Sequence, residues 1–374
     1  MESLATSAPA TLGALPVVTR ADKHLGRRLG EAITLRCHAL AETIVAHYQR
    51  LDSPPDAGEY PTRRGDQPAD VVQLLLHLAE SAAASRPSLF AEHVAWVKIV
   101  LFSRRESCEP LFTKLHVLRE VLSQELPPEL ARHACQYVEA ALDRLPVMPS
   151  TLPAFLDQDQ PLSDLAGRYL GSLLRGDRRL AGELILDAVR DGTPVEDVYL
   201  HVFQRSLCEI GRLWQVNRLS VAQEHYCTAA TQSIMSRLYP CMFPTKKKGR
   251  RFVAACVDGE LHEIGMCMVA DLLEMHGWDT YYLGADAPAS GVVQALIDRQ
   301  ADVLGVSAAT PLRARAVAEL ISVVRGEPKC RRVKILAGGH LFNRAADLWQ
   351  AVNADGYAAD AVQAVAAAQR VLSG

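Results

Sequence analysis

Three short motifs carry residue types that could bind a metal and a flat ligand. The first, Glu260-Leu261-His262-Glu263-Ile264-Gly265, contains an imidazole between carboxylates. Ser307-Ala308-Ala309 follows after 41 intervening residues, and Gly338-Gly339 follows after 28 more. A neutral imidazole binds a transition metal through one ring nitrogen, which leaves the other nitrogen of His262 for a carboxylate such as Glu260. The paired glycines would let a ring system lie directly against the backbone.

Each motif follows a segment that the hydrophobic pattern predicts to be a strand. Apolar runs at residues 252–257, 280–283, 303–306 and 335–337 are typical of parallel strands buried on both faces. The helical stretches between and after them begin near His262, Pro288, Pro311, Asn343 and Asp360. This alternation predicts a five-stranded doubly wound domain over residues 250–374, in which ligands bind at the carboxyl ends of the strands.

Together, the three motifs resemble the flavodoxin-like, cobalamin-binding fold of the methionine synthase and mutase families. The resemblance implies that His262 ligates cobalt from below and that the two later motifs line a slot for the nucleotide tail. Glu260 stands where Asp is usual in these families, and a carboxylate two residues before the ligand can still orient the imidazole. The residues so implied are Glu260, His262, Gly265, Ser307, Gly338 and Gly339.

A second helical block precedes this domain, over residues 155–245. Its loops at 176–177, 191–194 and 218–220 have the spacing of a short four-helix bundle. Within it, Trp214 is followed after nine residues by Glu224-His225. Without the cobalamin motifs nearby, a core tryptophan and an exposed Glu-His pair would be the better explanation of these residues.

The spacing of Trp214 and Glu224-His225 resembles the adenosylcobalamin-dependent photoreceptors, in which a helical bundle caps the upper face of the corrin. The resemblance implies that Trp214 packs over the adenosyl group and that Glu224 bonds its ribose. It further implies that His225 replaces the adenosyl carbon on cobalt once light breaks that bond.

The N-terminal part of the chain predicts a separate, all-helical domain. Residues 1–20 are small and contain proline, which is typical of a disordered segment, and residues 21–150 are helical in pattern. They contain no helix-turn-helix with a basic recognition helix, and residues 89–98 look like part of a globin-like or related sensor domain. This layout resembles the photocobilins, in which a helical domain holds biliverdin near the cobalamin.

A bilin carries two propionates, so the resemblance implies basic partners in the helical domain. The candidates are His93, Lys98, Arg104, Arg105 and His116. Cys108 in the same segment could form a thioether, although a single Cys is more often a small buried residue. For each of these residues taken singly, surface charge or core packing is an equally good explanation.

Composition narrows the class of protein. Hydrophobic residues make up 49% and charged residues 22% of the 374 residues, as in soluble globular proteins. A net charge of −3 argues against direct nucleic-acid binding. No apolar run approaches the roughly 18–20 residues that span a bilayer, and no secretory signal is recognisable. Nine cysteines without regular spacing indicate free thiols, so we expect a cytoplasmic protein.

The sequence contains no nucleophile elbow, no phosphate-binding glycine loop with Lys-Ser/Thr and no zinc-type cysteine pairs, which favours a sensor over an enzyme. The hypothesis is a light sensor that binds adenosylcobalamin (with biliverdin as a second chromophore). Photolysis would change the cap packing and the homo-oligomeric state, or the contact with an unidentified downstream protein. The alternatives are a corrinoid methyl carrier that serves separate methyltransferases, and a cobalamin-binding transcription partner that does not respond to light.

Overall fold

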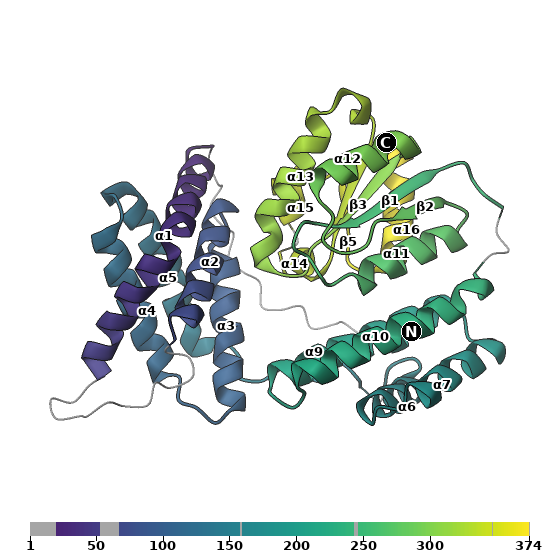
Figure 1. The fold of residues 1–374 in the computed structure, drawn as a ribbon, viewed down its shortest axis with the longest axis horizontal. Coiled ribbons are helices and arrows are strands. Elements are labelled where there is room, and N and C mark those ends of the chain that lie inside the picture. The colour runs from purple at the N-terminus through teal and green to yellow at the C-terminus, as the bar shows by residue number, and fades with distance from the viewer. Residues whose placement is uncertain (1–19, 53–66, 158, 243–245, 346, 374) are drawn as a thin grey trace, which may run out of the picture.

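The computed structural model describes residues 20–52, 67–157, 159–242, 246–345 and 347–373. These ranges form an N-terminal helical bundle, a smaller helical cap and a parallel sheet covered by helices (Figure 1). This arrangement confirms the predicted fold class. Disorder was predicted for residues 1–20, and all but the last of these lie outside the described residues. Within the described ranges, no helix is both long and apolar enough to cross a membrane.

Five helices build the N-terminal bundle. They are α1 (Arg20–Asp52), α2 (Pro68–Ala83), α3 (Pro87–Ser103), α4 (Glu109–Glu125) and α5 (Pro128–Arg144), followed by the short η1 (Leu145–Val147). Each of α2 to α5 has proline in its first turn, where the missing N–H would have no helical partner anyway. Gly26 and Gly30 let α1 approach the backbone of α2 closely, since a Cβ at Gly30 would lie 2.8 Å from the carbonyl oxygen of Ala79.

Lys98 is buried inside this bundle, and its ammonium group is used for packing. It donates hydrogen bonds to the carbonyl oxygens of Leu145 at 2.8 Å and Met148 at 2.7 Å, with that of Pro146 at 3.5 Å. These bonds hold the turn after α5 against α3. They correct the expectation that Lys98 binds a bilin propionate, because its donors already face backbone carbonyls.

The cap consists of helices that pack below the sheet domain in the view of Figure 1. They are α6 (Ser163–Leu174), α7 (Arg178–Arg190), a continuous helix made of α8 (Val195–Asp197), π-helical η2 (Val198–Gln204) and α9 (Arg205–Gln215), then α10 (Val221–Leu238) and η3 (Tyr239–Cys241). Ser220 begins α10 with a capping box, in which its hydroxyl accepts from Gln223 N and its own N–H donates to Gln223 Oε1. The capping box fixes the start of α10, the helix that carries Glu224 and His225.

The sheet has the strand order β2-β1-β3-β4-β5, and all neighbouring strands are parallel. The strands are β1 (Arg251–Cys256), β2 (Asp279–Tyr282), β3 (Val303–Ser307), β4 (Lys334–Gly338) and β5 (Gly356–Ala358). The prediction that the four apolar runs are buried on both faces is wrong for β2. Its residues alternate between exposed and half-buried because β2 is an edge strand. The fifth predicted strand had no assigned position, because β5 is only three residues long and forms no recognisable apolar run.

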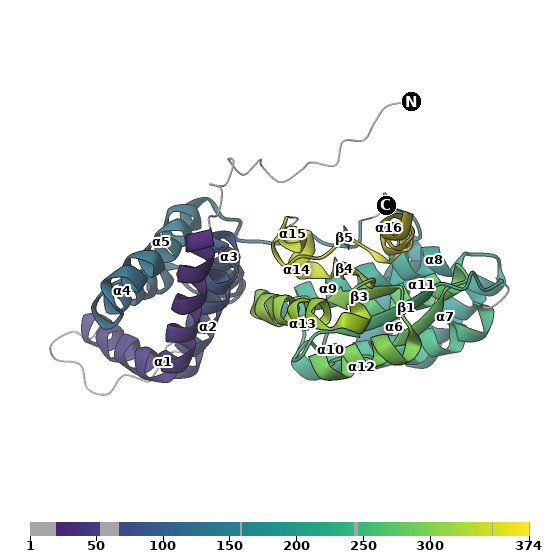
Figure 2. The ribbon, with the colours of Figure 1, turned by 90° about the horizontal axis from the view of Figure 1, so that it is seen from above.

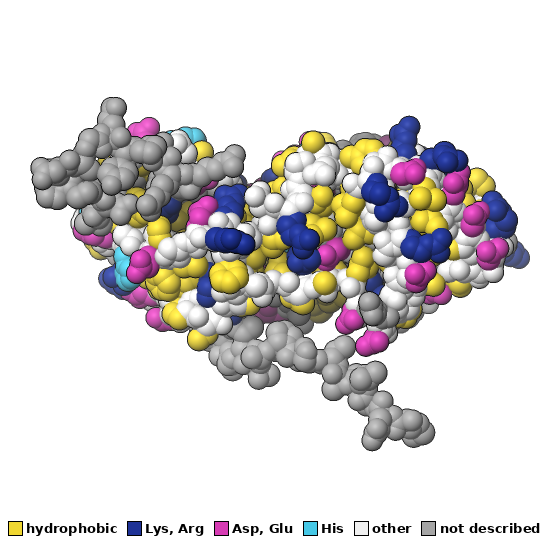
Figure 3. All heavy atoms as spheres, turned by 90° about the horizontal axis from the view of Figure 1, so that it is seen from below, with side chains coloured by type: hydrophobic (Ala, Val, Ile, Leu, Met, Phe, Trp, Pro, Cys, Tyr) yellow, Lys and Arg dark blue, Asp and Glu magenta, His cyan; other side chains and the backbone are white. Residues whose placement is uncertain are grey.

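Two groups of helices cover the two faces of the sheet. On one face α11 (Ile264–Met275) and α16 (Ala361–Ser373) share a core with the cap. The other face packs against α12 (Ala289–Arg299), α13 (Ala314–Gly326), α14 (His340–Arg344) and α15 (Leu348–Ala351), with η4 (Pro311–Arg313) and η5 (Pro328–Cys330) between them. On the face drawn in Figure 3, acidic and basic side chains are interspersed among the described residues.

The bundle docks on the sheet domain through the corner between α2 and α3. Leu89 of α3 is fully buried and belongs to the core beneath α12–α15. Three ion pairs surround this contact: Glu80–Arg315 at 3.3 Å, Arg86–Asp347 at 2.6 Å and Glu92–Arg344 at 2.9 Å. Figures 1 and 2 both show α2 and α3 as the side of the bundle nearest α13 and α14. The bundle is therefore held next to the segments that follow β3 and β4.

Replacing Lys98 by Met should lower the free energy of unfolding of the bundle by about 2 kcal/mol, because methionine keeps the volume but removes the donor from the buried bond to the Leu145 carbonyl and from the part-buried bond to the Met148 carbonyl. Urea denaturation followed by circular dichroism measures this loss. Arg132→Met, on the exposed side of α5, should change it by less than about 0.5 kcal/mol. Equal stability of the Lys98→Met and Arg132→Met variants would contradict the packing role of Lys98.

Candidate cofactor-binding site

Glu260 joins the loop after β1 to the loop after β3. Its carboxylate is almost fully buried, and Oε1 accepts from the backbone N–H of His262 at 2.9 Å while Oε2 accepts from that of Ala309 at 2.7 Å. Burial by itself raises the pKa of Glu260. The hydrogen bonds from His262 and Ala309 outweigh that effect and hold the pKa below its usual value. Glu260 is therefore a buried, ionised acceptor at the carboxyl ends of two adjacent strands.

The imidazole of His262 is held at one nitrogen and open at the other. Nδ1 lies 2.6 Å from Glu260 Oε1, and 70% of the side chain remains exposed. This hydrogen bond raises the pKa of His262, although partial burial opposes it. With the Nδ1 proton donated to the carboxylate, the lone pair of the neutral ring lies on Nε2. The arrangement that the sequence predicted for Glu260 and His262 is the one that prepares an imidazole to bind a metal.

Glu263 ties the same loop to its surroundings. Its Oε2 accepts from the hydroxyl of Tyr282 at 2.8 Å and from Ala285 N at 3.1 Å, and its Oε1 accepts from Gln232 Nε2 of α10 at 2.8 Å. The His262 loop is thus connected to the edge strand β2 and to the cap. Glu263 lies within the predicted motif but received no role from the sequence. The available signal was a second carboxylate directly after the imidazole, at the start of a helix.

The glycines of the site differ in how much space surrounds them, and only some positions would exclude a larger residue on steric grounds. Gly339 has φ of +94°, and a Cβ there would lie 2.9 Å from Ser307 Oγ and collide with the carbonyl oxygen of Ala308. Packing within the chain therefore requires Gly339, whereas the sequence suggested a ring system against it. At Gly338 a Cβ would lie 3.3 Å from the carbonyl oxygen of Ala358. At Gly265 no atom lies within 4 Å of a Cβ, so the space beside the start of α11 is open.

The cap presents its predicted residues at its surface. Glu224 accepts a hydrogen bond from Thr228 Oγ1 at 2.9 Å and pairs with His225 Nδ1 at 2.8 Å, and the His225 side chain is 73% exposed. Trp214 at the end of α9 is 41% exposed. The helix that carries Glu224 contacts the His262 loop, because Gln232 of the same helix donates a hydrogen bond to Glu263 at 2.8 Å. The charge of Glu224 also contributes to the raised pKa of His262.

These residues fit a corrinoid better than a bare metal ion. Among the described residues, no group of three or more His, Cys, Asp and Glu side chains could enclose a metal. An open imidazole nitrogen on its own suits a metal that brings its equatorial ligands with it, as cobalt in a corrin ring does. The open space beside Gly265 and the exposed Trp214 and His225 provide surfaces for such a large cofactor.

The candidate bilin residues do not converge. His93 is partly buried and its ring stacks on that of His77. Arg104 and Arg105 are exposed beyond the end of α3, about 16 Å from His93 at 1.5 Å per residue. His116 is exposed on α4, and Cys108 is half-buried just before that helix. Of the predicted set, His93 is connected to the cap through the ring of Trp96, which contacts Trp214.

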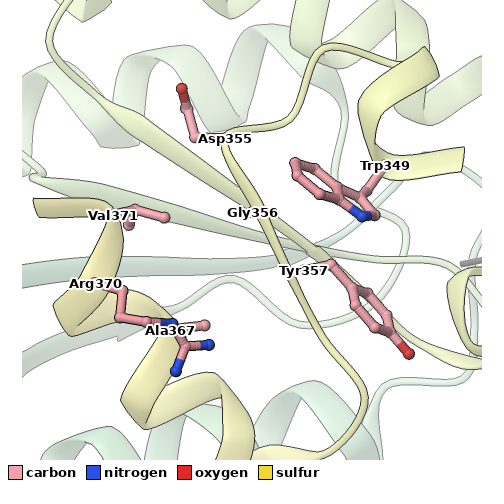
Figure 4. Close-up of a pocket in the computed structure, with 7 residues that line it drawn as sticks. All are labelled: Trp349, Asp355, Gly356, Tyr357, Ala367, Arg370 and Val371. Carbon is pink, nitrogen blue, oxygen red and sulfur yellow. The ribbon is translucent and has the colours of Figure 1, made fainter. Parts of the chain in front are cut away.

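A further pocket lies away from these residues. It is lined by Trp349, Asp355, Gly356, Tyr357, Ala367, Arg370 and Val371. Figure 4 shows these side chains around β5, between α15 and α16. Asp355 and Gly356 stand at the amino end of β5, whereas the Glu260–His262 pair stands at the carboxyl end of the sheet. This pocket therefore does not belong to the candidate site.

Two segments of the chain match models of known domain families. Residues 250–366 match the B12 binding domain family, and residues 165–239 match a second family with the description B12 binding domain. The sheet domain and the cap are therefore cobalamin-binding domains. The chain belongs, through these two domains, among the cobalamin-binding proteins.

Individual relatives agree with this class. Dimethylamine corrinoid protein 2 of Methanosarcina acetivorans is 29% identical over 170 residues, which cover 45% of this chain and 76% of the relative. The HTH-type transcriptional repressor CarA of Myxococcus xanthus is 32% identical over 123 residues, 32% of this chain and 41% of the relative. The structure of the Methanosarcina barkeri monomethylamine corrinoid protein has a TM-score of 0.51 at 19% identity, covering 57% of this chain and 100% of that chain, and supports the fold.

Replacing Glu260 by Gln should weaken cobalamin binding about 10- to 100-fold, because an amide orients the imidazole less well and makes it less basic. Titration of the protein with hydroxocobalamin, followed by absorbance, measures the change in Kd. Asp298→Asn, on the exposed face of α12, serves as the control. An unchanged Kd in a folded Glu260→Gln variant would show that this carboxylate does not tune the ligand.

The two glycine roles predict opposite effects of alanine. Gly339→Ala should cost about 1–3 kcal/mol of stability because of its positive φ and the collision with Ala308. Gly265→Ala should leave stability equal or improved by up to about 1 kcal/mol, since alanine favours the helix, but it should weaken cobalamin binding. Thermal unfolding without cofactor and titration with hydroxocobalamin separate the two effects. Full affinity of Gly265→Ala would place the cofactor elsewhere.

Proposed function

We propose that this protein is a cobalamin-dependent sensor, in which the cap and the N-terminal bundle together respond to the upper face of the corrin. The observation that carries this proposal is the contact between Trp214 of the cap and Trp96 of α3, whose ring centroids are 6.2 Å apart. The bundle thus touches the cap at the residue proposed to cover the upper ligand. It also docks beside the segments that follow β3 and β4.

The finer proposal is that the upper ligand is an adenosyl group and that the signal is light. Trp214 offers an exposed ring to the apolar part of this group, and Glu224 offers carboxylate oxygens to ribose hydroxyls. When bound, the cofactor would supply a cobalt–carbon bond that light can break. The imidazole of His225 is exposed and pairs with its neighbour Glu224, so a shift of the cap could bring it to the metal from above.

Rearrangement of the cap is the proposed output. Tyr199 of the cap donates to Asp271 Oδ2 of α11 at 2.8 Å, and Gln232 donates to Glu263, so the cap is linked to the sheet domain by polar contacts as well as by its core. A ligand that interacts differently with two arrangements of the cap shifts the balance between them. The shift would change a homo-oligomeric state or the contact with a downstream protein.

Biliverdin remains the proposed second ligand, and the bundle is its proposed site. Within the predicted set, His93 is the residue placed near the cobalamin domains, through the contact of its neighbour Trp96 with Trp214. Arg104, Arg105 and His116 are exposed and could meet propionates only at the surface. A red-absorbing band that appears when biliverdin is added and is lost in His93→Ala would support this site.

The relatives favour a second candidate function, a corrinoid methyl carrier that serves separate methyltransferases. The dimethylamine corrinoid proteins are more numerous among the relatives than the repressor, and Dimethylamine corrinoid protein 2 is covered over 76% of its length against 41% for the repressor. The comparisons thus support this candidate better than the light sensor. As a carrier, the chain would have to move its bundle away from Trp214 before another enzyme could reach the corrin. In neither proposed function does the chain itself catalyse a reaction.

Illumination distinguishes the two candidates. Green light should change the absorption spectrum of the adenosylcobalamin-bound sensor, and light scattering should report a different particle size. His225→Ala should alter the illuminated spectrum but not the dark one, whereas His24→Ala, an exposed histidine of α1, should change neither. Identical dark and light spectra with an unchanged size would refute the light sensor and leave the methyl carrier.

A further inference from the structure

We propose that Trp96 of the bundle is the second wall of the upper-ligand pocket, so that a flat heteroaromatic group above the corrin is held between Trp96 and Trp214. This inference rests on the proposed function, because it takes Trp214 as a residue of the upper face. It assigns a ligand contact to the N-terminal bundle, which lies outside both matched B12 binding domains.

The exposure of the two indoles is the first argument. Trp96 is 38% exposed and Trp214 is 41% exposed, although they contact each other. Tryptophan is usually well buried, and an exposed pair where two domains meet is typical of a surface that another group covers. The two rings come from α3 and α9, so an occupant between them would contact the bundle and the cap at once.

The separation of the rings is the second argument. A flat group that stacks on two rings needs about 3.5 Å on each side, hence about 7 Å between their centroids. The centroids of Trp96 and Trp214 are 6.2 Å apart and their planes are tilted by 40°. A movement of about 1 Å, with a rotation of one ring, would therefore admit a single flat ring system.

Trp96 is also held in a defined orientation. Its ring is nearly parallel to that of His93, at 9° and 6.1 Å between centroids, and His93 stacks in turn on His77 at 3.5 Å. Burial lowers the pKa of His77 to about 4 and that of His93 well below its usual value, so both rings are neutral near pH 7. No charge repulsion then disturbs the His77–His93 stack, beside which the Trp96 ring lies in a nearly parallel orientation.

The two walls are attached to different bodies. Leu89 and the Glu92–Arg344 ion pair fix α3 to the sheet domain, which carries His262. Trp214 belongs to the cap. A ligand held between the rings would therefore link the cap to the bundle, in addition to the contacts that each makes with the sheet domain, and its departure would remove that link. A purine is the chemical class that fits, whereas a methyl group offers no ring to stack on.

The test compares two cobalamins in the dark by titration of the full-length protein. Trp96→Ala should raise the Kd for adenosylcobalamin about five- to tenfold, the usual worth of one aromatic stack, and leave the Kd for methylcobalamin within about twofold. Trp96→Phe should restore most of the lost affinity. Phe102→Ala removes another exposed aromatic ring of α3 (52% exposed) and should change neither Kd.

Each other outcome has a distinct meaning. An equal loss for both cobalamins would show that Trp96 only packs the domains, and no loss would show that it is not a wall; either result overturns the inference. Failure of the proposed site looks different, since the wild-type protein would then bind neither cobalamin, or His262→Ala and Trp214→Ala would bind both as well as the wild type does.

Discussion

The site depends on one buried carboxylate that serves two loops. One oxygen of Glu260 accepts a hydrogen bond from His262 Nδ1, and the other accepts one from the backbone N–H of Ala309. Two neighbouring strands of a parallel sheet end at the same edge, and the carboxylate fixes how their loops lie relative to each other. The orientation of the imidazole is therefore set by the sheet itself, and a cofactor bound to Nε2 would be positioned by it.

The cap and the N-terminal bundle both pack against the sheet domain, but through different kinds of contact. The cap shares a hydrophobic core with α11 and α16 and adds the polar contacts of Glu263 with Gln232 and of Tyr199 with Asp271. The bundle inserts one leucine and surrounds it with ion pairs. The cap contact is therefore a shared apolar core with two polar contacts, whereas the bundle contact is one buried leucine with ion pairs around it. The bundle and the cap contact each other through Trp96 and Trp214.

The parts of this arrangement that follow from local pattern could be predicted from the sequence. Apolar runs located four strands, and the spacing of Glu260, His262, Ser307 and the glycine pair pointed to the edge of the sheet that carries the candidate site. The position of strand β5 could not be predicted, because its three residues form no recognisable apolar run. The partner of Lys98, the steric reason for Gly339 and the meeting of Trp96 with Trp214 all depend on which distant segments pack together, and no local pattern in a single sequence contains that information.

The burial of Leu89 has a consequence for modularity. This side chain belongs to the bundle by sequence and to the sheet domain by packing. The bundle is therefore not an independent module: removing it would uncover the apolar surface around α13 and α14 and would take the Glu80 and Glu92 carboxylates away from Arg315 and Arg344. Any domain that replaced it during evolution would have had to supply its own apolar side chain and its own carboxylates at this contact.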